Sequence, residues 1–396
     1  SKNMSEARLI LKAGRDKPLR QGHPWVYSGA IQRMQGEAAS GETVVVLDEK
    51  QRFIGRAAYS PFSKIRARMW SWDEDEAIDD SFFRKKIRIA IYSRKKNNSN
   101  AHRLINAESD HLPGVTVDRY ADYLVLQCLT TGAEYWKETI TSCLVELTGI
   151  PNVYERSDVE VRALEGLPQR CGVLAGAEPP TVIEIIENGL RYQVDIRGGQ
   201  KTGFYLDQRE NRAKVIPYTK GKSVLNCFCF SGAFSVIAVQ GGAEKMVSVD
   251  SSADAIELAK TNMSLNFPDF GNLEWVTADV FSYLRQLRDQ RESFDVIILD
   301  PPKFAPTRNL AEKAARGYKD INLLAMKLLN PGGRLITFSC SGGISAEFFQ
   351  KILSGAASDA GRRVIIEERL FQSRDHTVSL HFPEGEYLKG FICRVL

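Results

Sequence analysis

Three acidic residues follow three successive apolar runs in the second half of the chain: Asp250 after Lys245–Val249, Asp279 after Leu273–Thr277, and Asp300 after Phe294–Leu299. If these runs are parallel strands, their carboxyl ends meet at one edge of a sheet, where open α/β sheets bind ligands. Asp250 could accept hydrogen bonds from both ribose hydroxyls, and Asp279 from an adenine amino group, with Val280 packed against the ring. Each acid alone could simply cap the following helix, but the series favours a nucleoside-containing ligand.

A fourth apolar run, Ser223–Cys227, leads into a turn with one glycine, Gly232, and then into a predicted helix. Binding two phosphates at a helix N-terminus requires a G-x-G-x-x-G fingerprint, and its absence here argues against NAD or FAD. A single glycine that lets the backbone approach a ligand suits a cofactor without phosphates, such as S-adenosyl-L-methionine. Besides the three acids and Val280, the expected cofactor contacts in these turns are Asn226, Phe228, Ser231, Gly232 and Ser251.

Polar and aromatic residues are also dense in residues 199–209, just before the first of these runs. We expect this segment to cover the cofactor, with Tyr205, Asp207 and Arg209 in contact with it. The alternative is a helix N-terminal turn in which Asp207 forms a surface ion pair.

The stretch Asp300-Pro-Pro-Lys-Phe304 follows the run that ends at Leu299. Its two prolines stiffen the loop and would hold polar atoms beside a transferable methyl group. The stretch resembles the Asp/Asn-Pro-Pro-Tyr/Phe loop of methyltransferases that act on exocyclic amines. Lys303 stands where those enzymes place an aromatic residue, and this departure leaves the target atom open.

Cys340 ends another apolar run at the same predicted edge, within Phe338-Ser-Cys-Ser341. Carbon 5 of cytosine is a poor nucleophile, but a thiolate bonded to carbon 6 raises its electron density and allows methylation, proton loss and thiol expulsion. A thiol with an ordinary pKa of about 8.5 needs cationic or polar surroundings to ionise, and Lys303 is one candidate. Asp300 would then bind the N3/N4 edge of the cytosine. The alternative for Cys340 is a small residue buried at a strand end.

These residues need a scaffold, and alternating strands and helices over residues 191–396 predict an α/β fold, a parallel sheet with helices on both faces. Residues 76–190 are expected to form a mixed α/β central module with a basic helix at 81–96, and residues 1–75 a small β-barrel. Further strands are predicted at Gly333–Phe338, Val364–Glu368 and Gly390–Val395. The predicted helices are Ala233–Gln240, Ala253–Asn266, Phe281–Gln290, Gly317–Leu329 and Ser345–Ala360.

The net charge of +4 is unevenly distributed along the chain. Residues 1–72 hold 13 lysines and arginines against 6 acidic residues and so carry +7, which leaves −3 on the other 324 residues. This asymmetry predicts an N-terminal module that binds a polyanion, although a merely solvated basic surface is the alternative. The expected contacts are Arg56, Lys64, Arg66 and Arg68, together with Lys201 from the later polar cluster.

Other classes of protein are disfavoured by composition. The 396 residues contain no apolar run of about 18 residues and no secretory signal, so we expect no membrane span and a cytoplasmic location. The seven cysteines are scattered, odd in number and without a CxxC pair, which argues against a disulfide framework and against a metal site.

Combined, the motifs resemble the RlmI-type ribosomal RNA large subunit methyltransferases over nearly the whole chain. The matching stretches are Gly22-His-Pro-Trp-Val-Tyr27, Glu108-Ser-Asp-His-Leu-Pro-Gly114, Lys201-Thr-Gly-Phe-Tyr-Leu-Asp-Gln-Arg209, Asp300-Pro-Pro-Lys-Phe304, Arg316-Gly-Tyr-Lys-Asp320 and Phe338-Ser-Cys-Ser341.

The resemblance implies an N-terminal PUA-type RNA-binding barrel, a central α/β module and a C-terminal Rossmann-like class I methyltransferase domain. It further implies that S-adenosyl-L-methionine is the cofactor and that carbon 5 of a cytosine in 23S ribosomal RNA is methylated. Cys340 would be the nucleophile, Asp300 would lie near methyl group and base, and Asp250 and Asp279 would hold ribose and adenine. Other RNA 5-methylcytosine enzymes carry a second cysteine in the loop that here reads Asp-Pro-Pro-Lys, so release of the product has no second thiol.

Two alternative functions remain open at this point. Related domains with a similar Lys-Thr-Gly segment act on guanine, so a guanine-directed rRNA methyltransferase that uses the Asp-Pro-Pro-Lys loop is one. A non-catalytic RNA-binding factor in ribosome assembly is the other, although the intact acids at 250, 279 and 300 speak against it. The sequence also leaves open whether the protein is a homodimer.

Overall fold

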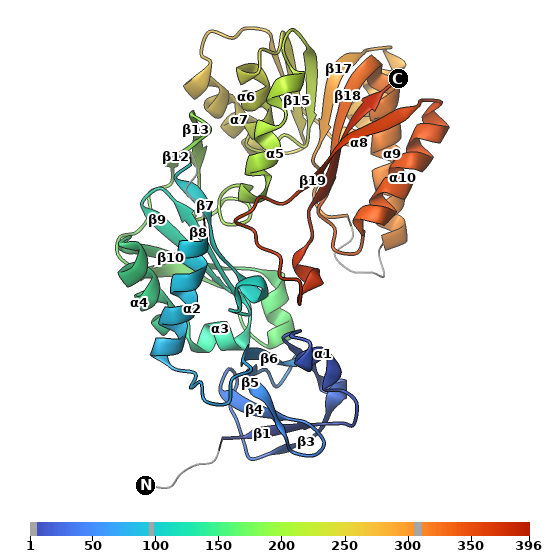
Figure 1. Ribbon diagram of the computed structural model, residues 1–396. Helices are drawn as coiled ribbons and strands as arrows, with labels where there is room; N and C mark the ends of the chain where they lie inside the picture. The colour runs from blue at the N-terminus through green and yellow to red at the C-terminus, as the bar shows by residue number, and fades with distance from the viewer. Residues whose placement is uncertain (1–5, 95–98, 305–310) are drawn as a thin grey trace. The chain divides into compact units, whose positions relative to one another are not determined.

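The computed structural model describes residues 6–94, 99–304 and 311–396, and Figure 1 shows how their helices and strands are arranged. Contacts between Cα atoms divide the chain into two units. The first comprises the chain up to Ile185 together with Val194–Phe204 and Arg374–Gly385, and the second comprises Ile186–Gln193, Tyr205–Ser373 and Glu386–Leu396. The predicted barrel and central module thus share one unit, which also takes up two segments expected in the methyltransferase domain.

The N-terminal part of the first unit is a six-stranded sheet in the order β2-β6-β5-β4-β1-β3. Alternate residues of β6 point to opposite faces, so Ala67 and Met69 are buried with Val44 and Val46 of β4 in one core. The elements are β1 (Arg8–Leu11), α1 (Lys17–Arg20), β2 (Trp25–Tyr27), η1 (Ser28–Ala30), β3 (Ile31–Gln35), β4 (Thr43–Leu47), β5 (Phe53–Tyr59) and β6 (Ile65–Ser71).

The central part of the first unit is a five-stranded sheet in the order β11-β10-β9-β8-β7. Its elements are α2 (Asp80–Ser93), β7 (Ala101–Asn106), η2 (Ala107–Asp110), β8 (Val115–Tyr120), β9 (Tyr123–Cys128), α3 (Thr131–Tyr135), α4 (Lys137–Thr148), β10 (Asn152–Ser157), η3 (Glu160–Glu165) and β11 (Arg170–Ala175). Asp79 caps α2 by accepting a hydrogen bond from the Phe82 amide, which fixes the start of the predicted basic helix. That helix ends at Ser93, and Lys95 and Lys96 lie outside the described residues.

One buried set of side chains in this module has the composition of a metal site: Cys128, Glu134 and Glu155. Cations of the protein already neutralise it. Lys137 donates hydrogen bonds of 2.9 Å to Glu134 and 3.1 Å to Glu155, and Arg162 donates one of 2.9 Å to Glu134. We therefore interpret the set as an ion-pair network, in which carboxylates are buried because they are paired.

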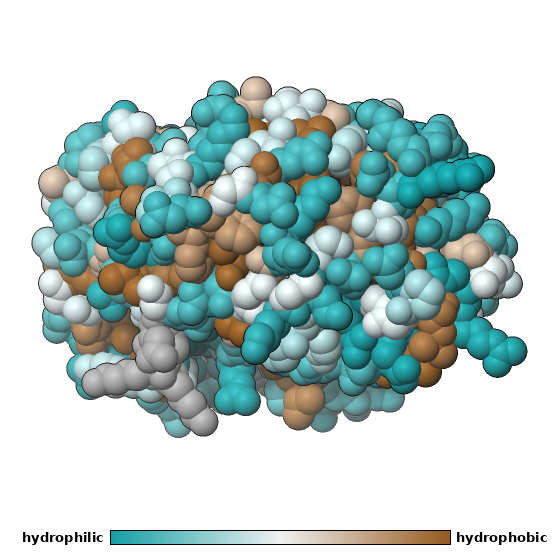
Figure 2. Space-filling view, turned by 90° about the horizontal axis from the view of Figure 1, so that it is seen from above, coloured by the Kyte–Doolittle hydropathy of each residue, from teal (hydrophilic) through white to brown (hydrophobic). Residues whose placement is uncertain are grey.

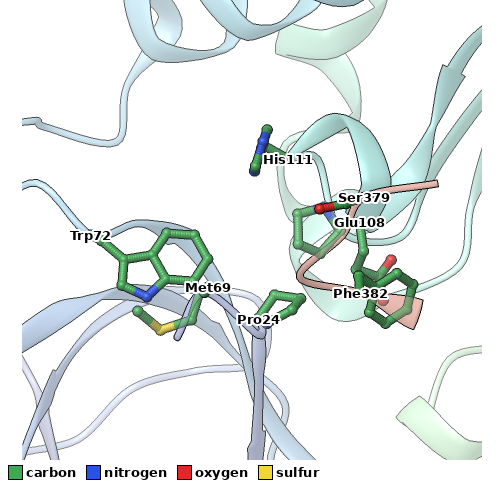
Figure 3. Close-up of a pocket in the computed structure, with 9 residues that line it drawn as sticks. Pro24, Met69, Trp72, Glu108, His111, Ser379 and Phe382 are labelled. Carbon is green, nitrogen blue, oxygen red and sulfur yellow. The ribbon is translucent and has the colours of Figure 1, made fainter. Parts of the chain in front are cut away.

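The two late segments of the first unit are anchored there by buried polar contacts. In Val194–Phe204, the Thr202 hydroxyl donates to Asp118 at 2.6 Å and lies 2.7 Å from the Tyr120 hydroxyl. In Arg374–Gly385, the Asp375 carboxylate accepts from the amide of Arg103 at 2.8 Å. Figure 3 shows Ser379 and Phe382 of that segment at a pocket whose other labelled residues are Pro24, Met69, Trp72, Glu108 and His111.

The second unit is built on a seven-stranded sheet in the order β16-β15-β14-β17-β18-β20-β19, in which β20 alone runs antiparallel to its neighbours among the described strands. The elements are β12 (Ile183–Glu187), β13 (Leu190–Val194), η4 (Leu206–Gln208), α5 (Arg209–Ala213), η5 (Ile216–Tyr218), β14 (Ser223–Cys227), α6 (Ala233–Gln240), β15 (Lys245–Asp250), α7 (Ala253–Asn266), β16 (Leu273–Thr277), α8 (Val280–Asp289), β17 (Phe294–Leu299), α9 (Ala311–Leu328), β18 (Leu329–Ser339), α10 (Ala346–Ala360), β19 (Val364–Phe371) and β20 (Lys389–Val395). The short helix η7 (Pro383–Gly385) belongs to the first unit. The α/β fold class predicted from the sequence is confirmed.

The expected boundary at residue 190 runs through a β-hairpin formed by β12 and β13. Asn188 and Gly189 at its tip both have positive φ angles, 52° and 76°, as a two-residue hairpin turn requires. The hairpin is tied to α5 of the second unit because Arg212 donates two 2.7 Å hydrogen bonds to the Glu187 carboxylate. The two units divide within the strands of this hairpin, after Ile185 and after Gln193, so its tip belongs to the second unit.

The hydropathy of the surface, the apolarity of the helices and the state of the cysteines were considered in the sequence and can be described in the structure. The face seen in Figure 2 is mostly hydrophilic, with hydrophobic residues scattered among polar ones. Among the described residues, no helix combines the length and apolarity that a bilayer crossing requires. All seven cysteines lie within the described ranges, and each is a free thiol.

Candidate active site

The candidate site lies at the carboxyl ends of the central parallel strands. Strand β14 pairs with β15 on one side and with β17 on the other, so the chain changes direction across the sheet between β14 and β17. Ligands of open α/β sheets bind outside the carboxyl ends of strands at such a switch point. Asp300 directly follows β17, and Cys340 directly follows β18. The sheet therefore brings the two residues with predicted chemical roles to the same edge.

The Asp250 carboxylate, at the end of β15, organises the loop after β14. It accepts hydrogen bonds from the amide of Phe230 at 3.0 Å and from the amide of Ser252 at 2.9 Å. Phe228 and Phe230 have positive φ angles of 58° and 45°, which non-glycine residues rarely adopt. The loop is thus held in a strained form, and each Asp250 oxygen keeps a second lone pair that could accept from a ribose hydroxyl. Ser251 is exposed.

Gly232 has a structural role in the packing of two helices. Its φ of 76° favours glycine, and a Cβ built on it would lie 2.7 Å from the Cβ of Ala259 on α7. The glycine is therefore required for close packing of the N-terminus of α6 against α7.

Asn226 and Ser231 are both buried. The Asn226 amide nitrogen donates to the Ser235 hydroxyl at 2.9 Å, and its oxygen is buried without a hydrogen-bond partner among the described residues. Such an atom is costly to leave unpaired, so it marks a position where a ligand or a water molecule belongs. The carbonyl of Ser231 instead accepts from Asn262 at 2.9 Å, which is a structural contact.

Asp279 adopts the helix-capping role that we considered as its alternative. One oxygen of its carboxylate accepts from both the amide and the hydroxyl of Ser282 at 2.9 Å, at the start of α8. The side chain is exposed, and its second oxygen takes no part in this cap. Val280 is only 2% exposed and belongs to the core of the unit, so little of its surface is left for an adenine ring.

The segment after Phe204 also reaches the site. Asp207 is buried and accepts a 2.7 Å hydrogen bond from the Tyr387 hydroxyl, so it forms no surface ion pair. The Tyr205 ring packs edge-on against Phe230, with centroids 4.9 Å apart. Burial raises the pKa of Tyr205, and the nearby carboxylates of Asp300 and Asp207 raise it further. Arg209 is 7% exposed at the start of α5.

Cys340 is half-buried, and its surroundings are polar. Its sulfur lies 3.9 Å from the carbonyl oxygen of Pro301, so the thiol and the Asp-Pro-Pro-Lys loop adjoin each other. The following residue is fixed because the Ser341 hydroxyl lies 2.7 Å from the Tyr318 hydroxyl and accepts from the Phe304 amide at 3.3 Å.

Cys227 and Cys229 are more deeply buried than Cys340. They are buried, and burial raises the pKa of both thiols, which suits packing residues better than nucleophiles.

Lys389 lies near the Cys340 thiol, although the sequence drew attention only to Lys303. Lys303, the predicted activator, is exposed. Lys389, the first residue of β20, is buried, and its ammonium nitrogen donates to the carbonyl of Ser341 at 2.6 Å and to that of Tyr387 at 2.7 Å. Burial lowers the pKa of Lys389 to about 8, against the opposing influence of Cys340 and Glu386. The available signal was a lysine at the head of an apolar strand, Gly390–Val395.

The predicted basic face of the N-terminal sheet is only partly present. Arg68 is mostly buried and pairs with Glu165 at 3.0 Å, and Arg56 donates to the carbonyl of Glu74 at 2.8 Å and pairs with Glu6 at 3.3 Å. These two arginines are engaged within the first unit, which leaves less of their surface available for phosphate contacts.

The side chains of the other predicted phosphate contacts, Lys64, Arg66 and Lys201, are at least partly exposed to solvent. Lys64 is exposed, and Arg66 is half-buried with a 3.1 Å hydrogen bond to the Ser63 carbonyl. Lys201, in the segment Val194–Phe204, is exposed.

Comparisons with known proteins agree with this architecture. Residues 161–374 match a family model described as S-adenosylmethionine-dependent methyltransferase, and residues 9–72 match one described as a PUA-like domain. A protein of Enterobacter sp. named ribosomal RNA large subunit methyltransferase I is 49% identical over 98% of this chain and 99% of its own. A namesake from Cronobacter sakazakii shows the same identity and coverage. A solved structure of a candidate methyltransferase complexed with SAH is 25% identical, covers 98% of this chain and 99% of its own, and superimposes with a TM-score of 0.86.

Proposed function

Since this chain belongs to the ribosomal RNA large subunit methyltransferase I family of S-adenosylmethionine-dependent methyltransferases, we propose that it methylates carbon 5 of a cytosine in 23S ribosomal RNA through a covalent bond to Cys340. One observation carries the proposal. The half-buried sulfur of Cys340 adjoins the Asp-Pro-Pro-Lys loop, 3.9 Å from the Pro301 carbonyl, at the sheet edge where ligands bind.

The residues at this edge fit S-adenosylmethionine. The buried, unpaired oxygen of Asn226, the carboxylate of Asp250 and the aromatic rings of Tyr205 and Phe230 offer acceptors and stacking surfaces, and a phosphate-binding glycine loop is absent from the described loop after β14. When bound, the cofactor supplies an electrophilic methyl group. Asp250 would hold the ribose and Asp279 the adenine amino group, through the oxygen that does not cap α8.

Cys340 performs the covalent step in this proposal. Its thiolate forms a bond to carbon 6 of the cytosine, which shifts the electron pair of the 5,6 double bond onto carbon 5 and makes that atom nucleophilic. Asp300 holds the N3/N4 edge of the base. After carbon 5 has gained its methyl group, loss of its proton restores the double bond, and the sulfur leaves carbon 6 as a thiolate. The loops directly after β17 and β18 contain no cysteine other than Cys340 in their sequence, so the same thiol begins and ends the reaction.

The first unit would bind the RNA. Its N-terminal sheet matches a PUA-like domain, and lysines such as Lys64 and Lys201 remain exposed for phosphate contacts. A base that is to react at the sheet edge has to leave its stack, as enzymes acting on bases generally require. We propose the cytoplasm as the location of this reaction and leave the oligomeric state to measurement.

Nucleoside analysis tests the target atom. Unmodified 23S rRNA transcribed in vitro is incubated with the full chain and methyl-labelled cofactor, digested, and analysed by mass spectrometry. We expect the label in 5-methylcytidine. Label in a methylguanosine would overturn the proposal in favour of the guanine-directed alternative, and no label at all would favour the non-catalytic assembly factor.

The Cys340→Ala variant tests the mechanism. We expect methylation to fall at least ~1,000-fold because the nucleophile is lost, while calorimetric affinity for SAH stays within about threefold of the unmodified chain. Cys171→Ala removes an exposed thiol elsewhere and serves as the matched control with full activity. Methylation of cytosine at a normal rate by Cys340→Ala would exclude the covalent route.

A further inference from the structure

Lys389 is placed beside the candidate nucleophile by the pairing of two strands. In the antiparallel ladder of β18 and β20, Lys389 lies directly opposite Ser339, the residue that precedes Cys340. Its side-chain nitrogen donates to the carbonyl of Ser341, the residue that follows Cys340, at 2.6 Å. The lysine thus contacts the backbone immediately after Cys340 and pairs with the backbone immediately before it. This position belongs to the fold, because the neighbouring Gly390 packs so closely on Phe338 that a Cβ there would lie 2.4 Å from its ring.

A buried lysine in this setting can exist in two protonation states. Two of its N–H groups are used by the carbonyls of Ser341 and Tyr387, at 2.6 and 2.7 Å. In the neutral amine the remaining position is a lone pair, which accepts a proton, and in the ammonium ion it is a third N–H, which donates one. Since burial lowers the pKa of Lys389 to about 8, both states are populated near neutral pH.

The charged groups around the pair favour proton exchange between sulfur and nitrogen. Cys340, Glu386 and Lys303 are the groups whose charges act on Lys389, and a Cys340 thiolate stabilises its ammonium form. Tyr205 and Tyr318 also interact electrostatically with Cys340, but burial raises the pKa of both phenols, so they stay neutral. Asp300, Asp207 and Asp250 act on Tyr205 from the other side of the site. Lys389, unlike these phenols and carboxylates, can carry a positive charge that stabilises a Cys340 thiolate.

We propose that Lys389 activates Cys340 by accepting the proton of its thiol and then stabilising the thiolate as an ammonium ion. The S–H bond breaks and an N–H bond forms, with no other change and no co-reactant. Lys389 acts through Cys340 and is a positioning residue in this sense, and its role rests on the proposed function of Cys340 as nucleophile. When the thiolate later leaves carbon 6, the same ammonium ion stabilises it.

The rate at which iodoacetamide alkylates Cys340, measured against pH by peptide mass spectrometry on the full chain, tests this proposal directly, because only the thiolate reacts. We expect Lys389→Gln, whose amide can still donate to both carbonyls, to shift the pH midpoint upward by about one unit and to slow alkylation at pH 7 about tenfold. Lys389→Arg cannot accept the proton, but its permanent cation still stabilises the thiolate. Because alkylation reports the thiolate fraction at equilibrium, we expect Lys389→Arg to restore alkylation at pH 7 to within about threefold of the unmodified chain. Cys171, exposed and remote in sequence, is alkylated in the same sample and provides an internal reference.

An unchanged midpoint in folded Lys389→Gln would overturn the proposal, and so would a midpoint that moves in Lys303→Gln but not in Lys389→Gln. If the Gln variant does not fold, the Arg variant decides, since loss of fast Cys340 alkylation in a folded Lys389→Arg chain would equally contradict it. Alkylation needs no RNA and no methyl transfer. Its outcome is therefore distinct from that of Cys340→Ala on rRNA, which tests the proposed function itself.

Discussion

The position of Cys340 is fixed by hydrogen bonds to the next residue, Ser341. Tyr318 on α9 and the amide of Phe304 hold the Ser341 hydroxyl, while Lys389 holds the Ser341 carbonyl. A reacting atom fixed in this way needs less ordering before it meets the base, and misplacement by about 1 Å can cost ~100-fold in rate.

Removing the Tyr318 hydroxyl should loosen the nucleophile without removing it. We expect Tyr318→Phe to lower kcat for rRNA methylation about tenfold, while the KM for the cofactor changes by less than about threefold, because the lost hydrogen bond serves the Cys340 loop alone. Tyr283→Phe, in the same core on α8, is the matched control and should keep full activity. Steady-state kinetics of both variants check this, and equal kcat values in the two would refute it.

Single residues also show what sequence reasoning could and could not establish. Asp250 and Cys340 were located correctly at the sheet edge because an apolar run followed by a polar residue marks the end of a buried strand. Lys389 was missed because its partner Ser339 is 50 residues away, and sequence alone does not give the register of an antiparallel pair. The capping by Asp279 was foreseen only as an alternative, since the same residue type at the same place serves both roles.

At the scale of elements, the loop between β14 and α6 is the part on which the cofactor site depends most. It contains two non-glycine residues with positive φ, Phe228 and Phe230, and it is closed by Gly232 at the start of α6. Strain of this kind persists only where the surroundings hold it, here through Asp250 and through the packing of α6 on α7.

Gly232→Ala should disturb this loop. The added methyl meets Ala259 at 2.7 Å in a backbone conformation that disfavours alanine, so we expect a loss of about 2–3 kcal/mol in the free energy of unfolding and weaker SAH binding. Gly271→Ala is the matched control, because nothing lies within 4 Å of its Cβ position, and it should change stability by less than about 0.5 kcal/mol. Urea unfolding and calorimetry measure both, and equal stabilities would contradict the packing role of Gly232.

Elements were predicted best where they are most hydrophobic. The expected bounds of β14, β16, β17, α6 and α7 match the structure because unbroken apolar runs and helical periodicity define them. Helix α9 begins at Ala311, earlier than the expected Gly317, and β18 begins at Leu329, within a stretch that its Pro331-Gly332-Gly333 made look like a turn. The hairpin of β12 and β13 was missed because its two strands are short and follow a pair of prolines.

At the scale of the whole molecule, the chain passes twice from the second unit into the first and back. The segments Val194–Phe204 and Arg374–Gly385 are held by buried groups of the central module, among them Asp118, Tyr120 and Arg103. Both segments were expected in the methyltransferase domain because they are polar, lack periodicity and contact partners as far as 361 residues away in the sequence. The ion pairs of the first unit likewise use several arginines that contributed to its basic count.

Lys64 and Arg68 should therefore respond differently to mutation. We expect Lys64→Ala to weaken binding of 23S rRNA a few-fold and to reduce the salt dependence of the affinity by about one phosphate contact. Arg68→Met should instead lower the free energy of unfolding by about 3 kcal/mol, because it leaves the buried Glu165 carboxylate without its cation. Filter binding at several salt concentrations and thermal unfolding separate the two effects. A stable Arg68→Met chain with a reduced salt slope would instead indicate that Arg68 contacts phosphate.

The covalent bond between residue 340 and the base can be trapped directly. In 23S rRNA transcribed with 5-fluorocytidine, the methylated adduct cannot lose the substituent at carbon 5, so the sulfur cannot leave carbon 6. With the cofactor present, we expect a complex that survives denaturation, and tryptic mass spectrometry should place the nucleotide on Cys340. The Cys340→Ala chain should form no such complex. The covalent role of Cys340 would be contradicted if the normal RNA is methylated at cytosine but the fluorinated RNA gives no adduct. An adduct on another residue would contradict it as well.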